Sequence, residues 1–86
     1  MPRPIEHDPD RQQFFAIVEG RRCRLDYQRQ GDRVLITHTL VPAELGGRGI
    51  AADLTQSALA WIRGQGLSVV PVCSYAARYL EREAGG

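Results

Sequence analysis

The chain has 86 residues, of which 43% are apolar and 24% are charged, and its formal net charge is +1. This length allows one domain with a modest core, the composition argues against a disordered chain, and the near-neutral charge gives no electrostatic case for nucleic-acid binding. No window is long and apolar enough for a membrane helix, and the N-terminus lacks the hydrophobic region of a signal peptide, so we expect a cytoplasmic protein whose two cysteines, Cys23 and Cys73, are reduced thiols.

Residues 1–11 are predicted to form a flexible N-terminal tail, because they combine three prolines with mixed charge. His7 lies within this tail and is expected to be solvated. Residues 12–83 are then expected to make a single folded domain.

Three strands are predicted in the first half of the chain. The stretch 13–19 is rich in β-forming residues that are apolar on both faces, which indicates a strand covered on both sides. Residues 22–28 alternate apolar and polar side chains, so this strand has one buried face, on which Cys23 is a small hydrophobe. A turn at residues 30–32 leads to a third strand at 33–41, and the three should form an antiparallel meander.

Three glycines, Gly46, Gly47 and Gly49, separate the third strand from a predicted helix. A backbone without Cβ atoms can turn successive N–H groups toward one point, and the first turn of a helix adds N–H donors without partners and partial positive charge. A phosphate group fits such a place, although a tight connection without a ligand is the alternative. Arg48 either helps to neutralise phosphate charge or is a solvated surface residue.

A helix, a strand and a second helix are predicted in the second half of the chain. Apolar residues recur at helical spacing after the glycines, and the tryptophan among them should pack against the sheet. These residues are Ile50, Leu54, Ala58, Trp61 and Ile62. Residues 67–72 form a fourth strand, which the helical crossover makes parallel to the third. The last helix begins at Ser74, a plausible N-cap.

Cys73 falls at the carboxyl end of the fourth strand and just before a helix N-terminus. Open α/β sheets bind ligands outside the carboxyl ends of parallel strands, and a helix N-terminus lowers the pKa of a thiol. The glycine turn follows the neighbouring parallel strand in the same sense. We therefore expect Cys73 and the glycines to open on one crevice, with a buried structural thiol as the alternative for Cys73.

Three segments, in this order and spacing, resemble the short single-domain branch of the GNAT N-acetyltransferase superfamily: His38-Thr39-Leu40-Val41-Pro42, Gly46-Gly47-Arg48-Gly49-Ile50-Ala51 and Pro71-Val72-Cys73-Ser74-Tyr75. The middle segment is similar to the family's pyrophosphate loop, Gln/Arg-x-x-Gly-x-Gly/Ala, with Gly46 where Gln or Arg is usual. The resemblance implies a minimal α/β (α+β) fold with a three-stranded antiparallel meander, a crossover helix, a fourth strand parallel to the third and a C-terminal helix. Of the Arg-His-Pro-Glu that usually follows the second helix, only Arg82 is kept.

The resemblance also implies acetyl-CoA or CoA as the cofactor, and no metal ligands are expected. The pantetheine arm should run along the backbone of the third strand, and the pyrophosphate should meet main-chain amides of the glycine segment. The residues implied in cofactor binding are Leu40, Val41, Gly46, Gly47, Arg48, Gly49, Ile50, Ala51, Cys73 and Ser74.

Acetyl transfer needs a neutral acceptor amine, and a lysine amine with a pKa near about 10.4 is less than about 0.1% neutral at pH 7. His38 is a candidate base, with a satisfied inter-strand histidine as the alternative. Glu44 is either a base that acts through water or a solvated loop residue. Cys73 either carries the acetyl group or lines the channel, and Tyr75 or Tyr79 either protonates the departing thiolate or packs.

The first hypothesis is therefore an N-acetyltransferase that moves acetyl from acetyl-CoA to a primary amine, with a protein lysine among the options. We expect a monomer with an open acceptor site that suits a peptide or a flexible amine. The alternative is a non-catalytic module that binds acetyl-CoA or CoA and regulates a partner. A nucleotide-phosphate binder is a third hypothesis.

Overall fold

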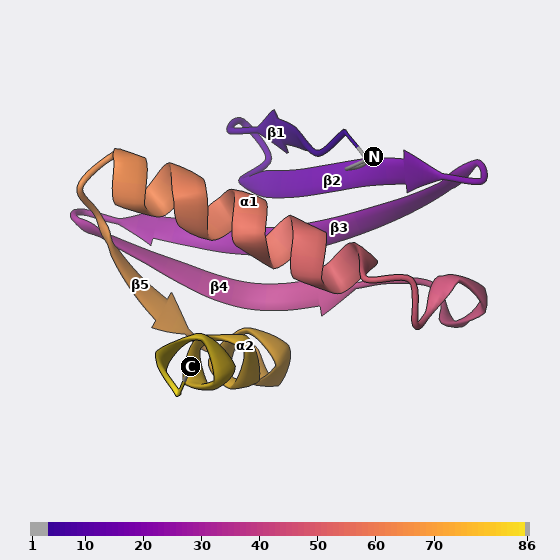
Figure 1. The fold of residues 1–86 in the computed structure, drawn as a ribbon. Coiled ribbons are helices and arrows are strands. Elements are labelled where there is room, and N and C mark those ends of the chain that lie inside the picture. Colours follow the sequence, from indigo (N-terminus) through magenta and orange to yellow (C-terminus); the bar gives the residue numbers. More distant parts are fainter. Residues whose placement is uncertain (1–3, 86) are drawn as a thin grey trace.

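The computed structural model describes residues 4–85 and contains, in chain order, β1 (Glu6–Asp8), β2 (Gln13–Val18), β3 (Arg21–Gln30), β4 (Arg33–Leu40), the 3₁₀ turn η1 (Ala43–Leu45), α1 (Ile50–Gly64), β5 (Ser68–Pro71) and α2 (Ser74–Ala84). The strands form one sheet in the order β1-β2-β3-β4-β5 (Figure 1). Neighbouring strands are antiparallel except β4 and β5, which are parallel.

The predicted meander is confirmed, but β2 is not covered on both sides as predicted, because Ile17 is 58% exposed. The alternation in β3 sets which face of the sheet is buried. This strand buries Cys23, Leu25 and Tyr27 and leaves the residues between them partly exposed. α1 lies across the sheet in front of β3 (Figure 1), and its apolar stripe covers the same face. The shared core contains Phe14, Cys23, Leu25, Tyr27, Val34, Ile36, Leu45, Ile50, Leu54, Ala58, Leu59, Ile62 and Ala76.

The predicted crossover is also confirmed, because α1 connects β4 to a strand that runs parallel to it. The ladder between β4 and β5 extends from Arg33 opposite Ser68 to Ile36 opposite Pro71. α2 follows and packs against α1, β4 and β5. No helix within residues 4–85 is long and apolar enough to cross a membrane.

Residues 6–8 differ from the predicted tail, because they form β1 and pair with β2. His7 is half-buried rather than solvated: its ring stacks on Phe14, with centroids 4.1 Å apart and an interplanar angle of 5°. Its Nε2 shares a hydrogen bond of 2.6 Å with the Tyr27 hydroxyl, and Trp61 meets it edge-on at 4.7 Å. Contacts with β2, β3 and α1 therefore stabilise β1, and local sequence does not reveal them.

We expect the stability of the fold to fall more steeply below pH 6.5 in the wild type than in a His7→Phe variant, which keeps the ring stacking. Burial lowers the pKa of His7 from 6.5, and the Asp8 carboxylate only partly opposes this. The unfolded chain therefore takes up the proton first, so the stability is present above pH 6.5 and is lost as the pH falls toward the folded-state pKa. Thermal unfolding of both proteins at about pH 7.5 and about pH 5.5 measures the difference. Equal losses in the two proteins would contradict this role.

Candidate functional site

The glycine segment between β4 and α1 adopts a conformation that other residues reach with difficulty. Gly47 and Gly49 have φ angles of +80° and +78°, in the left-handed region. Gly46 is extended instead, and a Cβ there would lie 3.2 Å from the Ala43 carbonyl oxygen. Two positions therefore favour glycine for backbone geometry, and at the third a Cβ would make a tight contact.

α1 begins directly after this segment, with Gly49 as its N-cap and no side chain capping it. Its first helical bond joins the Asp53 N–H to the Gly49 carbonyl at 3.0 Å. The N–H groups of Ile50, Ala51 and Ala52 therefore have no acceptor within the helix, at the end that the dipole makes positive. These three residues help to line a pocket of about 270 Å³, whose lining is Val41, Leu45, Gly46, Gly47, Gly49, Ile50, Ala51, Ala52 and Tyr75. A diphosphate fits this main-chain cradle.

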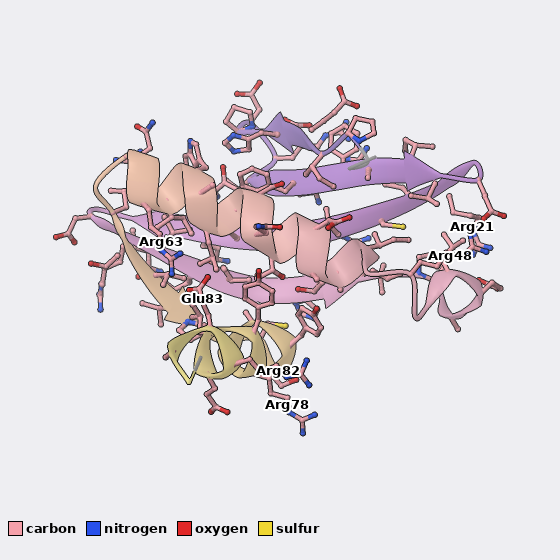
Figure 2. The ribbon with its side chains drawn as sticks, viewed as in Figure 1. Arg21, Arg48, Arg63, Arg78, Arg82 and Glu83 are labelled. Carbon is pink, nitrogen blue, oxygen red and sulfur yellow. The ribbon has the colours of Figure 1, made fainter. Side chains whose placement is uncertain are left out.

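Arg48 and Glu44 lie near this pocket but do not line it. Arg48 forms an ion pair with Glu19 at the β2–β3 turn, and Glu44 pairs with Arg21 at 3.3 Å. Figure 2 shows Arg21 and Arg48 together, where this turn approaches the glycine segment. Arg48 and Glu44 are thus both paired with residues of the β2–β3 hairpin, which are 29 and 23 residues away in sequence. A local sequence pattern does not reveal these pairs.

β4 and β5 separate at their carboxyl ends. Their last paired residues are Ile36 and Pro71, and the N–H groups of Val72 and Cys73 both donate to the Ile36 carbonyl, at 3.0 and 2.9 Å. β4 continues beyond this point, whereas the segment that follows β5 turns into α2. Within residues 4–85, the stretch 37–40 has no strand beside it on the β5 side. This edge of β4 can therefore pair with another extended chain.

Cys73 lies at this separation and is the N-cap residue of α2. The prediction of Ser74 as the N-cap is therefore wrong by one residue. Cys73 keeps an extended backbone, and its carbonyl already accepts the Ala77 N–H at 3.0 Å, so the helix begins at Ser74. Both cysteines of the chain are free.

The surroundings of the Cys73 thiol favour its thiolate form. The thiol is partly buried, and its Sγ lies 3.7 Å from the Thr39 hydroxyl on β4. Burial raises its pKa, but the nearby polar groups of Ala76, Thr39 and Tyr75 favour the thiolate, outweigh this effect and lower the pKa. Cys23, in contrast, is fully buried in the core, as predicted. Cys73 is thus the cysteine suited to chemistry.

His38 lies on the other side of β4 from Cys73. A β-bulge in the β3–β4 ladder sets the register, so that His38 is opposite Asp26 and Thr39 is opposite Leu25. Successive side chains along a strand point to opposite faces, and Thr39 shares its face with Leu25 of the core and with Cys73. His38 is exposed on the opposite face. The structure therefore does not bring these two candidate catalytic residues together.

A second hollow, of about 320 Å³, lies between α1 and α2 and was not predicted. It is lined by Ala52, Tyr75, Tyr79, Arg82 and Glu83. Ala52 and Tyr75 also line the pocket at the glycine segment. Burial is the largest influence on Tyr75 and raises its pKa. The charge of Arg82 lowers this pKa, but Tyr79 and Asp53 raise it, so the pKa stays above its ordinary value. Tyr75 therefore keeps its proton at neutral pH. Sequence reasoning singled out Arg82 as the remnant of a motif but placed no site there.

Comparison with known proteins matches residues 13–85 to the model of the GCN5-related N-acetyl-transferase family. Protein NATD1 of Gallus gallus and protein NATD1 of Mus musculus are each 35% identical to the chain over 83 residues, which cover 93% of this chain and 76% of the relative. Protein NATD1 of Homo sapiens is 35% identical over 83 residues, covering 93% of this chain and 74% of the relative. The family match includes every element from β2 to α2, and so both hollows.

Proposed function

Because this chain belongs to the GCN5-related N-acetyltransferase family, we propose that it transfers an acetyl group from acetyl-CoA to a primary amine, a class that includes protein lysine. The observation that carries this proposal is the pocket at the glycine segment, whose lining includes the first three residues of α1, whose N–H groups lack helical acceptors. When bound, acetyl-CoA would supply an activated acetyl thioester.

In this proposal, main-chain N–H groups of residues 47–51 hold the diphosphate, and Arg48 adds positive charge nearby while it remains paired with Glu19. The edge of β4 at Leu40 and the following residue, Val41, receive the pantetheine arm, and Val41 lines the same pocket. We assign the thioester end to Cys73 and Ser74, where the N-terminus of α2 offers further N–H donors.

Two proton transfers are assigned to side chains on either side of β4. The acceptor amine must lose a proton, and His38 is the proposed base; because it lies on the exposed face of β4, the proposal places the approaching amine on that face, at the gap where β4 and β5 separate. Glu44 is the weaker candidate, because Arg21 engages its carboxylate and it would act through water. Tyr75 keeps its proton and lines the cofactor pocket, so it is the proposed donor to the departing thiolate.

Titration calorimetry with acetyl-CoA and CoA, followed by a thiol-release assay with a panel of primary amines, tests the proposal. We expect saturable binding at one site and thiol release that depends on the amine. Saturable binding without amine-dependent release would assign the chain to the non-catalytic, CoA-binding class instead. Displacement by simple nucleotides as effective as displacement by CoA would indicate a nucleotide-phosphate site, and the absence of saturable binding would overturn the proposal.

A further inference from the structure

The hollow between α1 and α2 continues the pocket at the glycine segment, because Ala52 and Tyr75 line both. A ligand whose diphosphate lies against the first turn of α1 can extend in two directions, toward β4 and toward α2. Coenzyme A has two such arms, the pantetheine chain and adenosine 3′-phosphate. Since the pantetheine arm is assigned to β4, the second hollow is the place for the adenosine arm.

The lining of this hollow suits a purine and a phosphate. The rings of Tyr75 and Tyr79 have centroids 6.5 Å apart and an interplanar angle of 32°. Tyr75 is assigned to the thioester end, so Tyr79 is the ring that offers a base an aromatic surface for stacking. Arg82 has no hydrogen bond or ion pair with another residue in the range 4–85. The positive charge of Arg82 lowers the pKa of Tyr75 and so partly opposes the effect of burial. Both side chains line the hollow between α1 and α2.

Glu83 is the acidic residue in this lining, and Arg63 of α1 engages it. Arg63 Nη2 donates to one Glu83 carboxylate oxygen at 2.5 Å, and Nη1 donates to the other at 3.4 Å. Figure 2 shows the two side chains meeting between α1 and α2. The hydrogen bond lowers the pKa of Glu83 and raises that of Arg63. Because both carboxylate oxygens are occupied, the positive charge of Arg82 is not cancelled by its neighbour.

We propose that Arg82 binds the 3′-phosphate of the adenosine arm and thereby makes this chain distinguish coenzyme A from dephospho-coenzyme A, with Arg63 as the positioning residue that holds Glu83 aside. The inference rests on the proposed function. A phosphate monoester near neutral pH carries close to two negative charges, and a guanidinium binds it through parallel N–H donors. Dephospho-coenzyme A keeps the diphosphate and the adenine but offers Arg82 no such group.

Titration calorimetry of the full chain with coenzyme A and with dephospho-coenzyme A tests the role of Arg82. We expect the wild type to bind coenzyme A about tenfold more tightly, and Arg82→Gln to remove most of that difference by weakening coenzyme A alone. Arg78→Gln is the matched control, because Arg78 extends from the same helix one turn earlier (Figure 2) and lines neither hollow. Equal wild-type affinities, or equal effects of the two variants, would overturn the proposal.

Arg63→Gln tests the positioning role separately. The freed Glu83 carboxylate would compete for Arg82 and repel the phosphate, so we expect coenzyme A affinity to fall about threefold while dephospho-coenzyme A affinity is unchanged. Arg63→Gln/Glu83→Gln is expected to restore coenzyme A affinity. Equal losses for both ligands, or no restoration, would overturn the role of Arg63. If neither ligand binds the wild type, the proposed function itself fails, whereas equal binding of both rejects only this inference.

Discussion

Gly49→Ala is expected to weaken coenzyme A binding by about tenfold or more. Gly49 has a φ of +78°, so an alanine that keeps this conformation costs about 1–2 kcal/mol, and the loop can relieve that strain only by moving. No atom lies within 4 Å of the position that a Cβ would take there, so the methyl group enters open space at a residue that lines the pocket. The N–H groups of Ile50 and Ala51 follow the loop, and the main-chain cradle is lost.

Gly31→Ala is the matched control for this experiment. Gly31 has a φ of +63° and equally open space around an added methyl group, but it lies in the turn between β3 and β4. Urea unfolding should show similar losses of stability for the two variants, whereas calorimetry should show a loss of affinity for Gly49→Ala alone. Unchanged affinity in both variants would mean that the glycine segment does not hold the diphosphate.

The main elements could be predicted from the sequence because their signals are local. The alternation around Cys23 identifies the half-buried strand β3, and the helical spacing from Ile50 to Ile62 identifies α1. The glycine cradle is equally local, since consecutive main-chain groups form it. β1 could not be predicted in this way, because His7 is held by rings on β2, β3 and α1 rather than by its neighbours in sequence.

The side-chain part of the site depends on distances in space that a local pattern does not contain. Arg48 pairs with a glutamate 29 residues away. The β-bulge in the β3–β4 ladder adds one residue to β4, so every later β4 side chain changes face. His38 therefore lies on the face of the sheet away from Cys73. The availability of Arg82 depends on the contact between Arg63 and Glu83, which are 20 residues apart.

Cys73→Ala is expected to lower the rate of acetyl transfer by about 100-fold or more and to leave coenzyme A affinity within about twofold. Affinity persists because main-chain groups hold the diphosphate. In the covalent route, the Cys73 thiolate attacks the thioester carbonyl carbon, the Sγ–carbon bond forms as the donor's carbon–sulfur bond breaks, and Tyr75 protonates the departing thiolate. The acceptor amine then attacks the acetyl carbon, loses its proton to the base, and releases Cys73 as a thiolate.

Intact mass after brief exposure to acetyl-CoA distinguishes this route from direct transfer. The sequence contains no lysine, so an adduct that persists in Cys23→Ala and disappears in Cys73→Ala maps to Cys73 rather than to the terminal amine. Cys23 is the matched control, because it is fully buried in the core and out of reach of the cofactor pocket. Full turnover by Cys73→Ala, together with no adduct on the wild type, would mean that the amine attacks the thioester directly and that Cys73 only lines the site.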